Sequence, residues 1–278
     1  MDFVDRLIDL ALEEDLGAAG DVTTQALVPE GARGRAEVWA KEPLVLSGTR
    51  AFARVFLRLE PAAEVRFAQP DGARIGGRAV VGSVSASLRT LLVGERTALN
   101  ILQRTCGIAT LAARAADAVK GSRLRIIDTR KTSPGMRRLS KEAVRAGGAS
   151  NHRFGLFDGV LIKDNHIAAV GGDVREALRR ARAHAPLLVK IEIEVTGLAQ
   201  LPEAIDGGAD IVLLDNMDDA TLAEAVRIAA GRVRLEVSGN VTLERLPKLA
   251  QLGVDYVSMG ALTHSARAMD LSLEIVER

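Results

Sequence analysis

A repeated spacing of short apolar runs constrains the second half of this chain more than any other feature. Six such runs follow one another, and they begin at residues 124, 159, 188, 210, 233 and 255. The last four begin 22 or 23 residues apart, which is the length that one strand, one helix and two short loops require. Alternating strands and helices form a parallel sheet covered by helices. We therefore expect a doubly wound sheet or a barrel, complete or incomplete.

The stretches between these runs have the periodicity of helices. Apolar residues recur three and four positions apart in the segments that begin near residues 173, 218 and 242. Helix N-caps are expected at Asp173, at Asp218 or Asp219, and at Thr242.

The first part of the chain has a different pattern. A helix is expected over 3–15, strand-like segments follow from residue 35, and a long helix over 89–120 is expected to be interrupted at Gly107. These elements indicate an α+β unit with hairpin-type strands. We expect an N-terminal α+β sandwich-like domain over 1–106, joined by 266–278, and a barrel domain over 107–265.

The composition argues against several classes of protein. Lys and Arg number 37 against 36 Asp and Glu, so the chain lacks the basic excess of a broad nucleic-acid-binding surface. Aromatic residues make up only 3%, which leaves few for stacking on bases. The one cysteine, Cys106, cannot form an internal disulfide, and this fits a cytoplasmic protein. No run approaches about 18 apolar residues, so no membrane span is expected.

Polar residues stand at the carboxyl ends of the six apolar runs. In parallel sheets and barrels these ends meet at one mouth, so the side chains should converge there. A single polar residue at a strand end is more often a turn or cap residue, and for Asp164 the two interpretations are equally good. The convergence of unlike charges favours a site built from Asp128, Thr129, Arg130 and Lys131; Lys163, Asp164, Asn165 and His166; Glu192 and Glu194; Asp215 and Asn216; Ser238, Gly239 and Asn240; and Ser258 and Gly260.

Two glutamates lie within the third run. In "KIEIEV", Lys190, Glu192 and Glu194 alternate with apolar residues, so they should point to one side, the barrel interior. Buried carboxylates need cations or a metal as partners. Glu194 and Asp215 stand at neighbouring strand ends, and one or two carboxylates with substrate phosphates suit Mg²⁺. Whether Glu192 or Glu194 is the main carboxylate stays open.

The segment 128–166 is rich in cations although the whole chain is balanced. Guanidinium groups bind carboxylates and phosphates through two parallel hydrogen bonds, so a small polyanion is the expected ligand. His152 lies in a Gly-rich loop of this segment and is a candidate ligand contact. For Arg137, Arg138 and Arg145, an exposed helix face is an equally good interpretation.

The fifth and sixth runs are each followed by Ser and Gly, in "EVSGNV" and "VSMGALTHS". Turns of this kind after the last strands of a barrel often bind phosphate through backbone N–H groups, although a tight turn alone also explains each glycine. No Walker motif, GxGxxG or GxSxG occurs, so neither a common nucleotide-binding loop nor a serine hydrolase is indicated.

Several segments together resemble the quinolinate phosphoribosyltransferase family, the carboxylating nicotinate-nucleotide pyrophosphorylases. They are "RTALNILQRTCGIAT", "DTRKTSPGMRRLSKEAVRAGGASNHRFGLFDGVLIKDNH", "IEIEV", "LLDNM", "EVSGNV" and "GVDYVSMGALTHS", in order along the chain. The resemblance implies an N-terminal sandwich-like domain and a C-terminal open, incomplete parallel α/β barrel. It also implies a homodimer in which one subunit's first domain caps the other's barrel, and it leaves assembly into hexamers open.

The resemblance further implies an enzyme of de novo NAD biosynthesis. Quinolinate and phosphoribosyl pyrophosphate, with Mg²⁺, would give nicotinate mononucleotide, CO2 and pyrophosphate. Lys131, Lys163, Glu194 and Asp215 would be catalytic, and the two carboxylates would hold Mg²⁺ partly through the substrate. The neighbouring subunit would contribute Arg96. The substrate-binding residues would be Arg96, Thr129, Arg130, Lys131, His152, Arg153, Lys163, Glu194, Asp215, Ser238, Gly239, Asn240, Ser258, Gly260 and Ala261.

The cations of the sequence fit this chemistry. Quinolinate carries two carboxylates and the donor carries a phosphate and a pyrophosphate, so fixed cations could hold both and position the ring nitrogen against ribose C1. Because adjacent side chains point to different sides, Arg130 is assigned to the pyridine carboxylate and Lys131 to the donor side. Whether Asp128 holds these cations or closes the turn stays open.

Two other functions compete with this one. A paralogue of the same fold, such as the molybdenum-transport-associated relative, would act on another acceptor, but Arg96, Arg130, Arg153 and Lys163 are more cations than one carboxylate calls for. A non-catalytic sensor would bind a pyridine carboxylate or a phosphosugar. A binder of one ligand would not need both an acceptor clamp and a pair of metal carboxylates.

Overall fold

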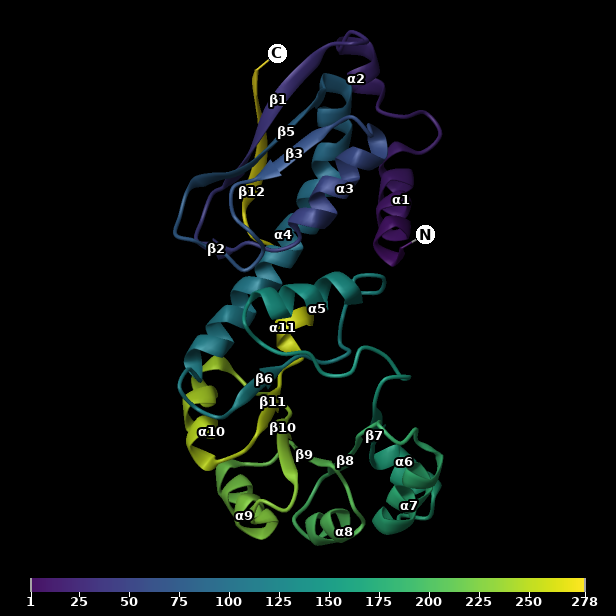
Figure 1. Ribbon diagram of the computed structural model, residues 1–278, viewed down its shortest axis with the longest axis vertical. Coiled ribbons are helices and arrows are strands. Elements are labelled where there is room, and N and C mark those ends of the chain that lie inside the picture. The colour runs from purple at the N-terminus through teal and green to yellow at the C-terminus, as the bar shows by residue number, and fades with distance from the viewer. Residues whose placement is uncertain (1, 278) are drawn as a thin grey trace. The chain divides into compact units, whose positions relative to one another are not determined.

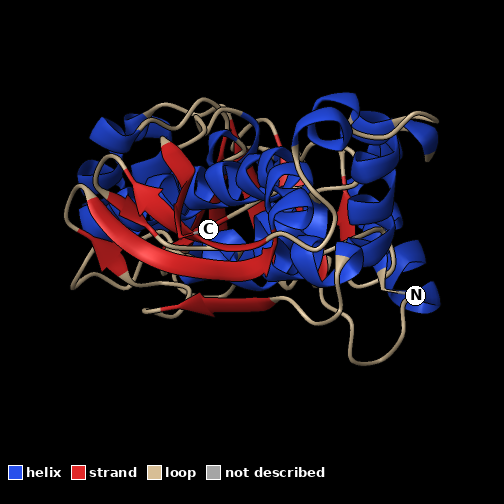
Figure 2. Cartoon of the chain, turned by 90° about the horizontal axis from the view of Figure 1, so that it is seen from above, coloured by secondary structure: helices blue, strands red, loops and turns tan. Residues whose placement is uncertain are grey.

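The computed structural model describes residues 2–277, which fall into two compact units. Unit 1 comprises Met1–Ala113, Thr132–Gly148 and Leu262–Arg278, and unit 2 comprises Arg114–Lys131 and Ala149–Ala261. Both units contain helices and strands (Figure 2). The cation-rich segment 128–166 is thus divided between the units, while the expected domain boundary after residue 106 stays a prediction.

Unit 1 is built on an antiparallel sheet with the strand order β12-β1-β5-β3. The strand β12 comes from the far end of the chain and pairs with β1 along its length. In β1, Ala36, Val38 and Ala40 are fully buried at alternate positions, as a strand with one face in a core requires. The strands of unit 1 are β1 (Arg33–Ala40), β2 (Leu44–Val45), β3 (Glu64–Phe67), β4 (Arg74–Ile75), β5 (Ala79–Ser87) and β12 (Leu271–Glu277).

Helices of unit 1 supply the large side chains of its core. Phe52 and Phe56 lie one turn apart on α3, are fully buried, and have ring centroids 5.2 Å apart. Leu139 of α5 and Ile8 of α1 belong to the same apolar cluster. The helices are α1 (Phe3–Leu16), α2 (Val22–Leu27), α3 (Thr49–Leu59) and α5 (Arg137–Ala146), together with α4 (Leu88–Ala118), which continues into unit 2.

The helix α4 is continuous through Gly107, so the expected interruption there is wrong. A Cβ atom on this residue would lie 1.8 Å from the carbonyl oxygen of Arg267. The glycine therefore serves close packing against the chain that leads into β12, and it does not end the helix.

Unit 2 contains a parallel sheet of six strands in the order β6-β11-β10-β9-β8-β7 (Figure 1). All six apolar runs are strands. The first strand, β6, pairs with the last, β11, and β6 and β7 form the two ends of the order, so the barrel is open between them. This confirms the expected fold class. The strands are β6 (Arg125–Ile127), β7 (Val160–Ile162), β8 (Ile191–Val195), β9 (Ile211–Asp215), β10 (Arg234–Ser238) and β11 (Tyr256–Ser258).

Helices connect successive strands of unit 2, and α8 and α9 lie on the outside of the sheet (Figure 1). The side chains of Asp173 and Asp218 cap their helices by accepting hydrogen bonds from the backbone N–H groups three residues on, whereas Thr242 makes no such bond. The helices are α6 (Asp164–Ala169), α7 (Val174–His184), α8 (Gln200–Asp206), α9 (Asp219–Ala229), η1 (Leu243–Arg245), α10 (Leu246–Leu252) and α11 (Ala261–His264), which crosses into unit 1.

Among residues 2–277, no helix has both the length and the apolar character that crossing a membrane would take.

Candidate active site

The register of the parallel strands places predicted site residues on one face of the sheet. Asp215 pairs with Ser238, and Glu194 pairs with Leu213, two residues before Asp215. Partners in neighbouring strands share a face, and so do residues two apart in one strand. Glu194, Asp215 and Ser238 therefore lie on the same face, near the carboxyl ends of their strands.

Lys163 and Glu194 form an ion pair between the ends of neighbouring strands. The Lys163 Nζ atom lies 3.0 Å from Glu194 Oε2. The glutamate side chain is 12% exposed and the lysine side chain 48% exposed. Pairs with an exposed partner contribute little to stability. The ammonium group of Lys163 is therefore free to reorient toward a substrate, while the carboxylate is held in place by its surroundings.

Two arginines in the site carry charges that repel each other. Burial lowers the pKa of Arg153, and the positive charge of Arg130 lowers it further, while the Glu192 carboxylate acts in the opposite direction. The Arg153 Nη1 atom donates a hydrogen bond to the carbonyl oxygen of Gly159 at 2.9 Å. Because guanidinium groups stay protonated, an anion bound between them would relieve the repulsion. This arrangement suits a carboxylate ligand.

Asp128 has a structural role that the sequence left open. It is fully buried, and its carboxylate accepts hydrogen bonds from the backbone N–H of His152 at 2.8 Å and from Asn151 Nδ2 at 2.7 Å. The turn that follows is closed by Thr129, whose hydroxyl oxygen accepts from the Lys131 N–H at 3.1 Å. Asp128 thus fastens the loop that carries His152 to the end of β6.

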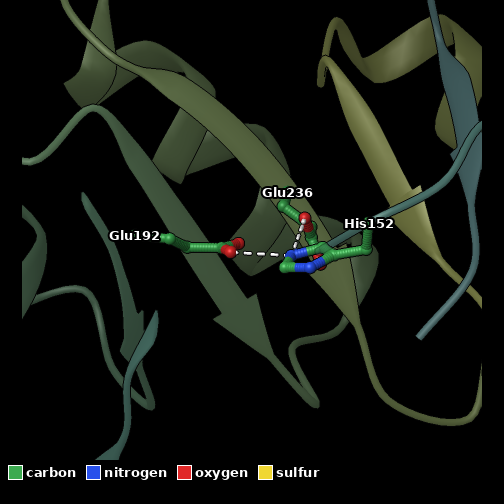
Figure 3. Close-up of side chains that lie close together, drawn as sticks. All are labelled: His152, Glu192 and Glu236. Carbon is green, nitrogen blue, oxygen red and sulfur yellow. Dashed lines mark hydrogen bonds and ion pairs between the residues drawn. The ribbon is translucent and has the colours of Figure 1, made fainter. Parts of the chain in front are cut away.

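His152 meets two buried carboxyl groups, those of Glu192 and Glu236 (Figure 3). The His152 Nε2 atom lies 2.8 Å from Glu192 Oε2 and 3.6 Å from Glu236 Oε2. Burial and the neighbouring charge of Glu192 raise the pKa of Glu236 well above its usual value, and a hydrogen bond from Ser258 acts in the opposite direction. Glu236 is not among the site residues predicted from the sequence. The sequence feature that could have indicated Glu236 is an acidic residue inside the apolar strand "RLEVS", the same feature that indicated Glu192.

The turn after β10 is built against the end of β9. Gly239 has a φ of +95°, and Asn216 and Asn240 adopt left-handed conformations with φ of 53° and 49°. A Cβ atom on Gly239 would lie 2.1 Å from Asn216 Oδ1. Asn216 Nδ2 donates to Asp215 Oδ2 at 2.7 Å. Asn216, which was expected only at a strand end, therefore links a proposed metal ligand to the Ser-Gly turn.

Some expected residues lie elsewhere or have other partners. Lys190 precedes β8 and is exposed, so it lies outside the strand that carries Glu192 and Glu194. Arg96 lies in unit 1, exposed on α4, and is not part of the geometry of unit 2. Arg138 pairs with Glu142 at 3.1 Å on an exposed face of α5, which favours the helix-face interpretation for it.

Comparison with known proteins supplies the family. Residues 21–106 match the N-terminal domain, and residues 108–274 the C-terminal domain, of the family described as quinolinate phosphoribosyl transferase. This chain belongs to the quinolinate phosphoribosyltransferase family. The resemblance inferred from the sequence is confirmed.

Relatives match over nearly the whole chain. "Probable nicotinate-nucleotide pyrophosphorylase [carboxylating]" of Bacillus subtilis is 39% identical over 97% of this chain and 92% of its own length. "Quinolinate phosphoribosyltransferase [decarboxylating] 2a, mitochondrial" of Nicotiana tabacum is 39% identical over 97% of this chain and 81% of its own. The crystal structure of NadC from Streptococcus pyogenes has a TM-score of 0.93 and 40% identity, and the match covers 99% of this chain and 97% of that one.

Proposed function

We propose that this family member transfers the phosphoribosyl group of phosphoribosyl pyrophosphate to quinolinate, with loss of CO2. The products are nicotinate mononucleotide and pyrophosphate, and the reaction belongs to de novo NAD biosynthesis. Support comes from the family match over both domains and from relatives whose names state this activity. The enzyme class is a pentosyl transferase, nicotinate-nucleotide diphosphorylase (carboxylating).

The observation that carries the proposal is the placing of Arg153, whose guanidinium is held by the Gly159 carbonyl and is influenced by the charge of Arg130, in the unit whose strand ends carry Glu194 and Asp215. The two guanidinium groups would bind a carboxylate of quinolinate, and Lys163 would bind the other after leaving Glu194. Arg130 and Lys131 follow one another, and Lys131 would face the donor. A second cationic contribution would come from Arg96 of the neighbouring subunit in a homodimer, an assembly that this proposal includes, with hexamers left open.

The carboxylates at the strand ends fit a magnesium ion. Glu194 and Asp215 offer hard oxygen ligands on one face of the sheet, both are only partly buried, and Mg²⁺ is commonly held by one or two carboxylates together with substrate oxygens. When bound, the ion would neutralise charge on the departing pyrophosphate. The 5-phosphate of the donor would lie against backbone N–H groups of the turns Ser238 to Asn240 and Ser258 to Ala261.

The reaction then needs positioning more than proton transfer. The ring nitrogen of quinolinate attacks ribose C1 with its lone pair while the bond from C1 to pyrophosphate breaks, and pyrophosphate leaves with the bonding electrons. The ring nitrogen is now cationic. When the bond from ring C2 to its carboxylate breaks, CO2 leaves, the electron pair stays on C2 next to that cation, and C2 takes a proton from solvent. Lys131 and Lys163 act through their charges.

We place this reaction in the cytoplasm. Cys106 is a free, buried thiol, and a chain without a disulfide fits a reducing compartment.

The test is an assay of the purified chain with quinolinate, phosphoribosyl pyrophosphate and Mg²⁺. Lys163→Ala should lower turnover as well as affinity, because the ammonium is expected to contact the reacting acceptor. Lys190→Ala, which removes an exposed lysine just before the amino end of β8, is the control. If Lys163→Ala kept full turnover and only weakened binding, its direct role in the chemistry would be excluded.

A further inference from the structure

The hydrogen bonds of His152 assign its tautomer. The backbone N–H of Arg153 donates to His152 Nδ1 at 2.8 Å, and Nε2 lies 2.8 Å from Glu192 Oε2. A backbone N–H can only donate, so Nδ1 must offer a lone pair. The ring hydrogen is therefore on Nε2, which donates to the carboxylate of Glu192. In this arrangement the imidazole is neutral, and both of its nitrogens bond within the protein.

The same assignment argues against a metal ion at this cluster. The ligand atoms of His152, Glu192 and Glu236 lie within 4.8 Å of one another, a spacing that a divalent ion would accept. A metal on Nε2 would need a lone pair there and a hydrogen on Nδ1. Nδ1 faces the Arg153 N–H donor, so the metal-binding tautomer would place two hydrogens against each other. The cluster is better suited to hydrogen bonds among its own residues than to binding a metal cation.

The two carboxyl groups lie on different strands and contact the same ring nitrogen of His152. Glu192 on β8 is 3% exposed and Glu236 on β10 is 1% exposed. Two buried carboxylates at this separation would repel strongly, and a proton on Glu236 removes the repulsion. Ser258 on β11 hydrogen-bonds Glu236. Glu236 thus lies beside the carboxylate that accepts from His152, and burial together with the charge of that carboxylate raises its pKa.

These contacts end at an arginine of the acceptor site. Asp128 at the end of β6 holds the backbone of His152, Glu192 holds the ring, and the ring holds the N–H of Arg153. The guanidinium of Arg153 is in turn fixed by the carbonyl of Gly159. A series of hydrogen bonds therefore leads from the sheet to the side chain that is proposed to bind a carboxylate of quinolinate.

We propose that Glu192 and Glu236 are positioning residues of this transferase, which act through His152. Glu192, with Glu236 beside it, fixes the ring as the neutral Nε2–H tautomer, and the ring fixes the backbone of Arg153. His152 then transfers no proton in the reaction, and it contributes to acceptor binding by placing the arginine. This inference rests on the proposed function, because it assigns the acceptor carboxylate to Arg153.

Two substitutions at Glu192 distinguish the loss of the hydrogen-bond acceptor for His152 from a general loss of folding. Glu192→Gln keeps a carbonyl oxygen that can accept from Nε2–H, whereas Glu192→Met has a similar length and no such acceptor. We expect Glu192→Met to raise the KM and the calorimetric Kd for quinolinate about tenfold or more, with KM for the pyrophosphate donor changed less than about threefold. Glu192→Gln should raise both constants clearly less than Glu192→Met, because its carbonyl oxygen still accepts from Nε2–H. Glu203→Met, on the exposed side of α8, is the control for an added apolar side chain.

The tautomer is measured directly by nitrogen-15 NMR of the parent protein labelled in its histidine rings, with His152→Gln to identify the signals. We expect an unprotonated Nδ1 and a protonated Nε2 in the folded protein under the conditions of the binding assay. The opposite tautomer, an imidazolium, or a shift of these signals on titration with Zn²⁺ or Mn²⁺ would overturn the inference. So would equal damage from both substitutions at Glu192. Quinolinate binding and the ring tautomer are measured without turnover, so absence of product alone would count against the proposed function only.

Discussion

Alanine at Gly239 should damage the donor site by displacing Asn216. An L-residue in a left-handed conformation costs about 1–2 kcal/mol, and Gly239 has a φ of +95°. The added Cβ would also lie 2.1 Å from Asn216 Oδ1 and 3.0 Å from the Asn216 backbone nitrogen. Asn216 must then move away from Asp215, and losing this hydrogen bond to a charged group costs about 1.5 kcal/mol more. Since about 1.4 kcal/mol corresponds to a factor of ten, kcat/KM for the pyrophosphate donor should fall about tenfold.

Gly231→Ala is the matched control. Gly231 also has a positive φ, +75°, but a Cβ there would meet nothing within 4 Å. It should carry the conformational cost alone, with unchanged kinetics. Urea unfolding gives the stability of each variant, and steady-state kinetics with the pyrophosphate donor varied gives the site effect. Equal stability losses and equal kinetics in the two variants would refute the role assigned to Asn216.

Three further changes have defined outcomes. Because the pKa of Glu236 is raised well above 4.5, the folded state keeps a proton that the unfolded chain releases, so stability falls as pH rises through that value and beyond. Glu236→Gln should therefore gain stability over the parent in urea melts as the pH is raised, and a constant difference would contradict the pKa shift. Burial raises the pKa of Cys106 to about 12. The native thiol should therefore resist a disulfide-exchange reagent near neutral pH and react only on unfolding. Rapid labelling of the native protein would show that the helix opens. Arg96→Ala and Lys163→Ala should each lose most of the activity. When the subunits of the two variants are exchanged, half of the dimers are hybrids with one intact site, so the mixture should regain roughly a quarter of the parent activity. No recovery would place both residues in one subunit's site.

The parallel sheet was predictable because its signal is local. Each of the six strands is a short apolar run, and the helices between them repeat at the spacing that one strand and one helix impose. The error at Gly107 had a non-local cause. Glycine in a helical pattern indicates a break, but here it is needed by the backbone of Arg267, which lies far along the sequence. A sequence pattern contains no information on such a contact.

The site was predictable to the extent that strand ends define a mouth. Lys163, Glu194 and Asp215 lie at strand ends as expected, and the register places the two carboxylates on one face. Glu236 was missed because its role depends on a contact with His152, which lies in a loop more than eighty residues earlier. Asp128 could not be assigned for the same reason, since its partners in the 149–153 loop are set by the fold.

The central claim is that this chain transfers the phosphoribosyl group to quinolinate and that loss of the 2-carboxylate follows in the same catalytic cycle. The most direct measurement uses quinolinate labelled with carbon-13 in its 2-carboxylate, together with phosphoribosyl pyrophosphate, Mg²⁺ and the purified chain. Labelled CO2, nicotinate mononucleotide and pyrophosphate should appear in equal amounts, with no product when nicotinate replaces quinolinate. Tight binding of quinolinate without labelled CO2, or product formed from nicotinate alone, would contradict the account.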